Sequence, residues 1–471
     1  MVLASLSFDY FLYLFIGAVI LVLLLDFLHD KGRIANFTIA ALVTVVGFVF
    51  ICMGSSGTLL ILDNYARIFA GIFLFSVLVI LPSLYTELSD VTRSGVFTAL
   101  ILASVLGAIV AVASRHLIFI ILGWELASIS SYALVGIRRR DPISMEAAMK
   151  YFLVGAVGSA LIFFGVSLIF GGTGSLDLLE IADILENGTY ERILVRTGIL
   201  ILSAGIGFKL AIVPFHIWIP DVYDGAPNSV TSYLAAVSKG MAFAVGIRIF
   251  YEGFMPIKDF WAPIFAILAI ITMTYANLAA LVQDKMKRML AWSSIAHAGY
   301  MLIVFGAPGS SPVIIIGAMF HVLTHAIMKI ASFVAARGVT DLVGSDLIDD
   351  YMGLRKIAPG TGASLTIMML SLAGIPPLAG FWSKYYIFLG AVENGYPLLA
   401  LIGVINSVIS LFYYARIIKN VYIEEARRES VTRRFNIGYS LPIAVLTMLI
   451  IALGLYPDPL LRILSTGVIS S

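Results

Sequence analysis

Long apolar stretches separated by short polar segments dominate the pattern of this chain. A helix of about 20 apolar residues crosses a bilayer core of about 30 Å, and fourteen stretches approach or exceed that length. They predict helices at Phe8–Leu28, Ile34–Met53, Ala66–Leu84, Ser94–Ala113, Leu117–Gly136, Ala147–Phe170, Thr197–Phe215, Ser229–Ile249, Trp261–Val282, Met289–Phe305, Val313–Ala336, Gly362–Leu389, Pro397–Arg416 and Ile437–Leu455. The pattern therefore predicts an all-α polytopic membrane protein.

Two of the predicted helices are interrupted by proline. The seventh runs into Pro214–Pro220, and the twelfth contains Gly374–Pro377. Proline removes a helix donor and clashes with the preceding turn. Irregular backbone at membrane depth is tolerated only where protein or a water-filled cavity surrounds it. Broken helices in corresponding places of two halves therefore indicate a transport site.

Basic residues concentrate in alternate loops. The odd-numbered loops and their flanks contain Lys31, Arg33, Arg138, Arg139, Arg140, Lys285, Lys287, Arg288, Arg355, Lys356, Arg427, Arg428, Arg433 and Arg434. The even-numbered loops are acidic or nearly neutral. Under the positive-inside rule the odd loops are cytoplasmic, and both termini lie on the outer side of the membrane.

The layout also predicts internal symmetry. Helices four to eight and nine to thirteen form two units of five helices, and an odd number of helices per unit inverts the second unit. The predicted segments are residues 1–93 (N-terminal helices), 94–250 (first repeat), 258–420 (second repeat) and 437–471 (C-terminal helix). No clear residue-level repeat is visible, so this symmetry follows from the layout alone.

Composition excludes several classes of protein. Hydrophobic residues make up 60% of the 471 residues and charged residues only 12%, against about 25% charged in soluble domains. With a mean hydropathy of +1.01, a water-soluble fold is excluded. Cys52 is the single cysteine, so an internal disulfide, an iron–sulfur cluster or a thiolate metal site is excluded. We expect no cofactor in this chain.

A few ionisable residues fall inside the predicted helices instead of at their ends. His321, His325 and Lys329 follow one another at i, i+4 and i+8, which places them on one helix face. The complete set is Glu125, Lys209, Lys239, His321, His325, Lys329 and Lys384.

Two interpretations compete for these charges. In the structural one, Glu125 pairs with a lysine and holds two helices together. However, an unpaired charge at this depth costs on the order of 2.5–3.5 kcal/mol, and one glutamate cannot neutralise three central lysines. Burial lowers a lysine pKa and pairing raises it again. A lysine whose partner comes and goes is poised to exchange a proton, so the surplus favours a proton relay.

The histidines have alternatives of their own. Two at i, i+4 are compatible with a metal site, but no third ligand lies near them in sequence. Imidazole titrates near neutral pH and passes a proton between its two nitrogens, which fits a relay between Lys239 and Lys384. His216, beside the first break, and His297 are weaker candidates.

Several motifs resemble the antiporter-like membrane subunits of respiratory complex I. The similarity runs from about Leu117 to Lys384 and beyond. The motifs are Gly123–Leu126, Phe208–Asp221, Gly225–Pro227, Lys287–His297, His325–Lys329 and Gly374–Lys384. Similar chains occur in F420H2 dehydrogenases, membrane-bound hydrogenases and multisubunit Na+/H+ antiporters of the same superfamily.

The resemblance implies fourteen helices, two inverted five-helix repeats and a hydrophilic axis halfway through the membrane. It also implies roles for the buried residues. Glu125 and Lys209 would be the coupling pair, and Lys239 would carry the connection together with His321 and His325. Lys384 would serve the second half-channel.

Among the paralogues, the chain is most similar to subunit N. Lys384 stands where subunit M has a glutamate, and Asp221–Pro227 resembles subunit N. The chain also ends soon after its fourteenth helix, without the long lateral helix of subunit L.

These features predict a proton-translocating membrane subunit of a redox-driven quinone oxidoreductase in a prokaryotic plasma membrane. Its expected partners are other membrane subunits, a peripheral redox arm and lipids, and we expect no nucleic acid. The alternatives are a subunit of a cation/proton antiporter or membrane-bound hydrogenase, and a structural subunit without conduction.

Overall fold

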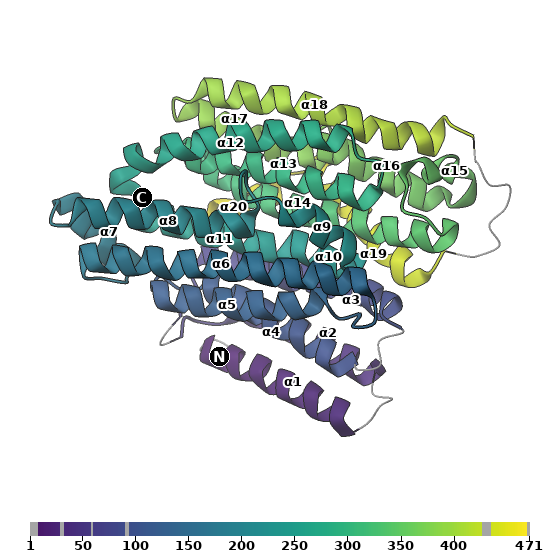
Figure 1. Ribbon diagram of the computed structural model, residues 1–471, viewed down its shortest axis with the longest axis horizontal. Coiled ribbons are helices and arrows are strands. Elements are labelled where there is room, and N and C mark those ends of the chain that lie inside the picture. Colours follow the sequence, from purple (N-terminus) through teal and green to yellow (C-terminus); the bar gives the residue numbers. More distant parts are fainter. Residues whose placement is uncertain (1–7, 29–32, 58–59, 90–93, 426–434, 469–471) are drawn as a thin grey trace.

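Helices account for nearly all regular structure in the part of the chain that the computed structural model describes, residues 8–28, 33–57, 60–89, 94–425 and 435–468. Within these ranges, strand-type pairing is limited to isolated bridges. Most helices run side by side along one direction, with α1 at one edge of the bundle and α18 at the other (Figure 1). The all-α class is confirmed.

The first half of the chain contains α1 (Phe8–Leu28), α2 (Arg33–Met53), α3 (Asn64–Glu87), α4 (Ser94–Val112), α5 (Leu117–Val135), α6 (Pro142–Thr173), α7 (Leu178–Asn187), α8 (Arg192–Leu210), α9 (Trp218–Gly225), α10 (Asn228–Tyr233), the π-turn η2 (Leu234–Ser238), α11 (Lys239–Arg248) and the π-turn η3 (Ile249–Gly253). The second half contains η4 (Met255–Ile257), α12 (Lys258–Leu281), α13 (Met286–Gly306), α14 (Val313–Val343), η5 (Ile348–Tyr351), α15 (Leu354–Ile357), α16 (Pro359–Ala373), α17 (Ala379–Glu393), α18 (Pro397–Tyr422), α19 (Ile437–Leu455) and α20 (Asp458–Ser465).

The number of membrane spans agrees with the prediction. Thirteen helical segments in the described residues are long and apolar enough to cross a bilayer. The half-helices α16 and α17, of 15 residues each, are individually too short. Together they complete a fourteenth span, which is the one predicted to be broken at Gly374–Pro377.

Several short helices and helix ends were not predicted. α7, α9, α15 and α20 have only 10, 8, 4 and 8 residues, below the length that marked a span. α6 begins five residues earlier than predicted because Asp141 caps it and Pro142 occupies its first turn, a common start signal. The predicted basic positions Lys31, Arg427, Arg428, Arg433 and Arg434 lie outside the described residues.

Backbone pairing supports the inverted repeat that the layout of the sequence predicts. Before α5, His116 forms a bridge with Asp177, which follows α6. Before α13, Lys285 forms the same kind of bridge with Leu347, which follows α14. The flanking hydrogen bonds match as well: 117 N to 176 O and 178 N to 115 O in the first, 286 N to 346 O and 348 N to 284 O in the second.

The two bridges lie at opposite ends of the bundle. The first adjoins α7, at the left of Figure 1, and the second lies near α15, at the right. Equivalent connections at opposite ends are what an inverted pair of repeats requires. The exact borders predicted for the four segments stay predictions.

Both breaks begin with the same C-terminal turn. At the end of α8, Ile212 N donates to Gly207 O and Ala211 N donates to Phe208 O. At the end of α16, Ile375 N donates to Leu370 O and Gly374 N donates to Ser371 O. This is the Schellman pattern, in which one residue adopts the left-handed conformation. Ala211 (φ 53°) and Gly374 (φ 89°) are those residues.

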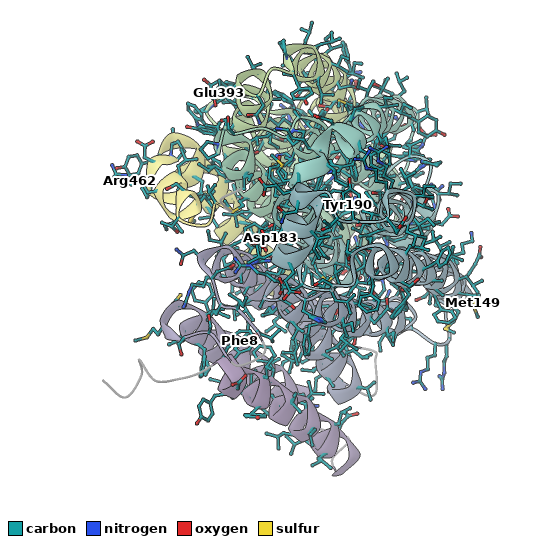
Figure 2. All side chains as sticks on the ribbon, turned by 90° about the vertical axis from the view of Figure 1, so that its left-hand side faces the viewer. Phe8, Met149, Asp183, Tyr190, Glu393 and Arg462 are labelled. Carbon is teal, nitrogen blue, oxygen red and sulfur yellow. The ribbon has the colours of Figure 1, made fainter. Side chains whose placement is uncertain are left out.

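Several charges at the helix ends are paired. At one end, Arg248 contacts Asp63 at 2.8 Å and Glu252 at 2.9 Å, and Arg115 contacts Glu252 at 3.0 Å. At the other end, Asp221 binds both Lys150 and Arg288. Figure 2 looks onto the left-hand end of Figure 1, where the acidic helix α7 lies. These ion pairs contrast with the buried lysines described next, which have no carboxylate partner among the described residues.

Candidate functional site

Lys209 occupies a polar pocket between α5, α6 and α8. Its Nζ donates to Ser128 Oγ at 3.0 Å and to Tyr151 OH at 3.1 Å. The same Nζ lies 5.4 Å from the centre of the Tyr151 ring, and Tyr151 OH lies 3.2 Å from Ser131 Oγ. Lys209 is buried, so hydroxyl groups and ring faces take the place of water around its amine.

Glu125 lies one helical turn before Ser128 on α5. It is half-buried, and its Oε1 has no hydrogen-bond partner. Among the described residues, no ion pair joins Glu125 to Lys209. The two predicted coupling residues are therefore neighbours through Ser128 and do not form a salt bridge here. The alternative in which this glutamate glues helices together has no contact to support it.

Lys239 begins α11 directly after the π-turn η2. A π-turn adds a residue to one turn of helix and redirects the side chains that follow. Lys239 Nζ donates to the Ser294 carbonyl oxygen on α13 at 2.9 Å. Ser294 Oγ in turn lies 3.3 Å from His325 Nε2 on α14. Lys239 and His325 therefore both hydrogen-bond to Ser294.

A hydrogen-bonded chain runs from α13 through α14 to α17. His297 Nδ1 lies 3.1 Å from His321 Nε2, and His321 Nδ1 lies 2.9 Å from Ser383 Oγ. The two imidazole rings are stacked, with centres 5.2 Å apart, and all three side chains are fully buried. Neutral imidazole has one donor and one acceptor nitrogen, so such a chain transmits a proton by tautomer exchange.

Lys329 joins this chain from the other side. Its Nζ donates to Leu290 O at 2.9 Å and to Ser293 Oγ at 2.6 Å. Ser293 Oγ hydrogen-bonds to Tyr414 OH, which lies 3.4 Å from His297 Nε2. A continuous set of contacts thus connects Lys329 with the histidines.

Lys384 follows Ser383 in sequence and lies at the second break. Its Nζ donates to Leu372 O at 2.8 Å, to Ala373 O at 3.2 Å and to Ser407 Oγ at 2.8 Å. The Leu372 and Ala373 carbonyls are the last of α16, where the helix dipole favours a cation.

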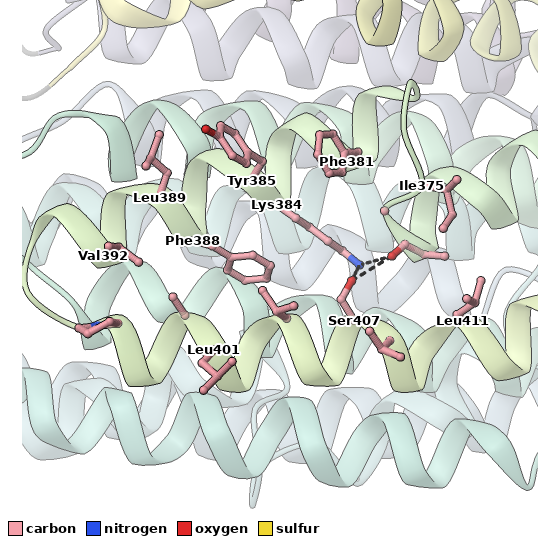
Figure 3. A pocket seen from close by; sticks show the side chains of 16 residues that line it. Ile375, Phe381, Lys384, Tyr385, Phe388, Leu389, Val392, Leu401, Ser407 and Leu411 are labelled. Carbon is pink, nitrogen blue, oxygen red and sulfur yellow. Dashed lines mark hydrogen bonds between the residues drawn. The ribbon is translucent and has the colours of Figure 1, made fainter.

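A groove of about 590 Å³ between α17 and α18 reaches this amine. Figure 3 shows the Lys384 side chain extending from α17 to Ser407 on α18, between Phe381 and Phe388. Apart from Lys384 and Ser407, the groove is lined mainly by apolar residues.

The ionisable residues Glu125, Lys209, Lys239, His297, His321, His325, Lys329 and Lys384 form a row through the bundle. This row is rich in cations and poor in carboxylates. None of Lys209, Lys239, Lys329 and Lys384 forms an ion pair with a described aspartate or glutamate. Each amine is held by carbonyl or hydroxyl oxygens, which accept a hydrogen bond from a neutral or a charged lysine. The row therefore accommodates both protonation states without rearranging an ion pair.

The hydrogen bonds of the four lysines fall into four groups. Lys209 belongs with Ser128, Tyr151 and Ser131, and Lys239 belongs with Ser294 and His325. Lys329 belongs with the His297–His321 chain, and Lys384 belongs with Ser407 and the end of α16. No direct bond between described residues joins the groups. Bridging across such a gap is a task for ordered water.

The sequence-based candidates occupy this row with one exception. His216 packs beside Tyr275 and Trp292, with ring centres 5.2 and 5.4 Å away, and no hydrogen bond between described residues joins its side chain to the row. His297, a weaker candidate, lies at its centre. The hydroxyls of Ser128, Tyr151, Ser293, Ser383, Ser407 and Tyr414 were missed. For Ser293, its position four residues before His297 was an available signal.

Metal ligation finds no support in the geometry. Within the described ranges, no group of three or more His, Cys, Asp or Glu side chains gathers closely enough to hold a metal ion. The histidines bond to each other and to hydroxyls instead. The expectation of no cofactor stays a prediction.

Comparison with known proteins identifies the family. The family model described as "NADH:quinone oxidoreductase/Mrp antiporter, TM" matches residues 114–410. The chain belongs to this family. The match covers both breaks and every candidate residue of the row.

Two curated relatives and one solved structure extend the similarity to nearly the whole chain. F(420)H(2) dehydrogenase subunit N of Methanosarcina mazei is 36% identical over 93% of this chain and 91% of its own length. NADH-quinone oxidoreductase subunit N of Ruthia magnifica is 36% identical over 94% of each chain. A chain of respiratory complex I from Thermus thermophilus superposes with a TM-score of 0.82 at 29% identity, over 97% of this chain and 100% of that one.

The resemblance to complex I membrane subunits, and to subunit N in particular, is thereby confirmed. This chain is a multi-pass membrane subunit of the kind found in bacterial and archaeal respiratory complexes. The fold with two inverted five-helix repeats is confirmed with it.

Proposed function

We propose that this chain translocates protons across the membrane as a subunit of a redox-driven quinone oxidoreductase. The observation that supports this most is the buried chain Lys329–Ser293–Tyr414–His297–His321–Ser383, which ends beside Lys384. Every link in it is a group that both donates and accepts a proton or carries an ammonium. Few structural roles need six such groups in sequence inside a bilayer.

The row divides the task among its groups of hydrogen bonds. Lys209, bound to Ser128 one helical turn from Glu125, receives the proton in the first repeat, and water carries it across the gap to Lys239. From Ser294 and His325 the proton enters the histidine chain. Lys384 takes it up at the second break, beside a groove that opens at the surface. The driving change in protonation comes from partner subunits, since we expect no redox group in this chain.

We further propose the setting of the chain. It lies in the plasma membrane of a prokaryote, with the basic loops in the cytoplasm and both termini outside. A peripheral redox arm and other membrane subunits complete the assembly. A cysteine introduced at exposed Arg139 or Leu347 and labelled from one side of the membrane tests the orientation. Labelling of the Arg139→Cys variant from the outer side would show that the chain has the opposite orientation.

Proton pumping by the purified complex in sealed vesicles tests the function. Lys384→Gln removes the titratable amine and keeps a hydrogen-bonding side chain, so we expect fewer protons translocated per electron. Lys356→Gln changes an exposed lysine near a helix end and is the matched control. If assembled Lys384→Gln complex pumps like the control, this chain does not carry protons through its row.

A cation/proton antiporter is the second candidate, because the matching family description includes the Mrp antiporters. The two candidates differ in their partners. Redox subunits that co-purify with the chain support the oxidoreductase. Their absence, together with Na+-dependent proton movement without electron donor, supports the antiporter.

A further inference from the structure

A second groove lies on the lipid-facing surface away from the row. It has a volume of about 870 Å³ and runs between α2, α3 and the start of α19. Apolar side chains line most of its length, among them Phe37, Ala41, Val45 and Leu81. Arg33 lies at one end of it, in the first turn of α2.

Arg33 lacks a partner for its charge. Its Nε and Nη2 are buried and form no hydrogen bond, and no described carboxylate pairs with it. Its guanidinium instead stacks over the Tyr85 ring, 4.3 Å from the centre. Buried polar nitrogens are satisfied in nearly all folded proteins, so an anion that arrives from outside the chain is the missing partner.

The groove has the length of one leaflet. From Arg33 to Val45 α2 rises about 18 Å, at 1.5 Å per residue. Half of a bilayer hydrocarbon core is about 15 Å. The arginine therefore stands at headgroup level, while the apolar walls extend to the middle of the membrane.

The surroundings of the groove suit an acyl chain. Its outer rim is apolar and exposed, with Leu42 59% accessible. An apolar rim that ends at an arginine matches the tails and the headgroup of an anionic lipid.

We propose that this groove binds one anionic diacyl phospholipid, with its phosphate on Arg33 and an acyl chain along α2 and α3. Guanidinium groups bind phosphate oxygens in pairs through charge-assisted hydrogen bonds. Stacking on Tyr85 fixes the plane of the fork, and the hydroxyls of Thr38 and Ser89 line the same end of the groove. The site is independent of the proton pathway proposed above.

Lipid retention by the purified complex tests the proposal. The complex is stripped with detergent and then titrated with phosphatidylglycerol or phosphatidylcholine of identical acyl chains, and bound lipid is counted by native mass spectrometry. We expect one saturable phosphatidylglycerol more than phosphatidylcholine. Arg33→Ala weakens that binding about tenfold, as loss of a charge-assisted contact predicts. Arg33→Lys recovers part of it.

Control variants distinguish lipid binding by Arg33 and the groove from an effect of net charge. Arg139→Ala removes an exposed arginine and leaves lipid binding unchanged. Ala41→Phe fills the groove, and retention of the lipid falls although Arg33 is intact.

Three outcomes overturn the proposal. They are equal phosphatidylglycerol retention by Arg33→Ala and the unchanged complex, equal affinity for glycerophosphoglycerol without acyl chains, and crosslinking of Leu42→Cys to another subunit in a Cys52→Ser background.

Discussion

The two broken helices carry the same chemical group in different surroundings. Lys209 lies on the half-helix before its break and is held by two hydroxyls and two aromatic rings. Lys384 lies on the half-helix after its break; it contacts the Ser407 hydroxyl and the Tyr300 ring, and it also bonds the last carbonyls of α16. Carbonyls at a helix C-terminus favour the charged amine, whereas hydroxyls serve either protonation state.

Access differs as well. A groove reaches the Lys384 amine, while the Lys209 pocket, about 10 Å³, has room for about one water molecule. The comparison suggests a division of labour: the first break holds a proton in an enclosed site, and the second exchanges it near the surface. Inverted repeats thus place similar backbones and different chemistry at the two breaks.

The largest expected effect comes from the packing of the second break. A Cβ at Gly380 would lie 2.0 Å from the Ser371 carbonyl oxygen, which is backbone and cannot yield. We expect Gly380→Ala to abolish assembly, measured as the amount of complex in membranes. Gly360→Ala, where nothing lies within 4 Å, is the control. Normal assembly of Gly380→Ala would mean that α16 and α17 are not packed as described.

Removing each lysine amine should destabilise the protein by different amounts at the two breaks. Leu372 O would face Pro376 in a continuing helix, and proline has no N–H, so Lys384 is the donor that satisfies it. Lys384→Met leaves this carbonyl unpaired, whereas Ser131 remains a partner for Tyr151 in Lys209→Met. We expect Lys384→Met to be less stable than Lys209→Met by about 1–2 kcal/mol, measured by thermal inactivation. The reverse order would contradict the comparison.

A smaller effect isolates the hydroxyl that holds Lys209. Tyr151→Phe keeps the ring and deletes one acceptor, which is worth about 1 kcal/mol, so proton pumping should fall about fivefold. Tyr132 also faces the amine with its ring, at 5.6 Å, but no bond from Lys209 to its hydroxyl is formed. Tyr132→Phe should therefore pump nearly normally. Equal losses in both variants would assign the effect to ring packing.

The smallest effect concerns the two equivalent bridges. Asp346 stands in the second bridge where Leu176 stands in the first. Burial raises the pKa of Asp346 from 3.8 to about 6, although Lys287 opposes the shift. The folded state therefore holds this proton more tightly, and stability falls as pH rises from about 4 to 6.

Asp346→Asn removes that penalty. We expect its unfolding temperature to exceed that of the unchanged chain by about 1–2 °C at pH 8 and to match it at pH 4. Leu176→Asn, at the first bridge, should bring no such pH-dependent gain. A gain of equal size at both pH values would exclude titration of Asp346 as its cause.

Much of this architecture could be predicted from sequence because bilayer physics is strict. Fourteen apolar stretches and two proline breaks determine the spans, and charges such as Lys239 and Lys384 stand out against an apolar background. The serine and tyrosine hydroxyls do not stand out, since the same residues occur throughout lipid-facing helices. Which of them face the row depends on helix rotation, as with Ser128 and Tyr151, and on the π-turn before Lys239.

The absence of a Glu125–Lys209 salt bridge was equally beyond the sequence. It depends on rotamers and on the competition of Ser128 for the lysine. The inverted repeat was predicted from the layout alone, without matching residues. Its equivalent positions became visible through backbone pairs, such as His116 with Asp177, that share no residue type with their counterparts.

The central claim is that protons pass through the histidine chain, and His321→Gln tests it most directly. Glutamine keeps a donor and an acceptor for His297 and Ser383 but cannot change tautomer or titrate. His216→Gln, which alters a buried histidine outside the row, is the matched control. We predict that the number of protons translocated per electron falls in His321→Gln and stays normal in His216→Gln. An unchanged ratio in fully assembled His321→Gln complex would contradict the account.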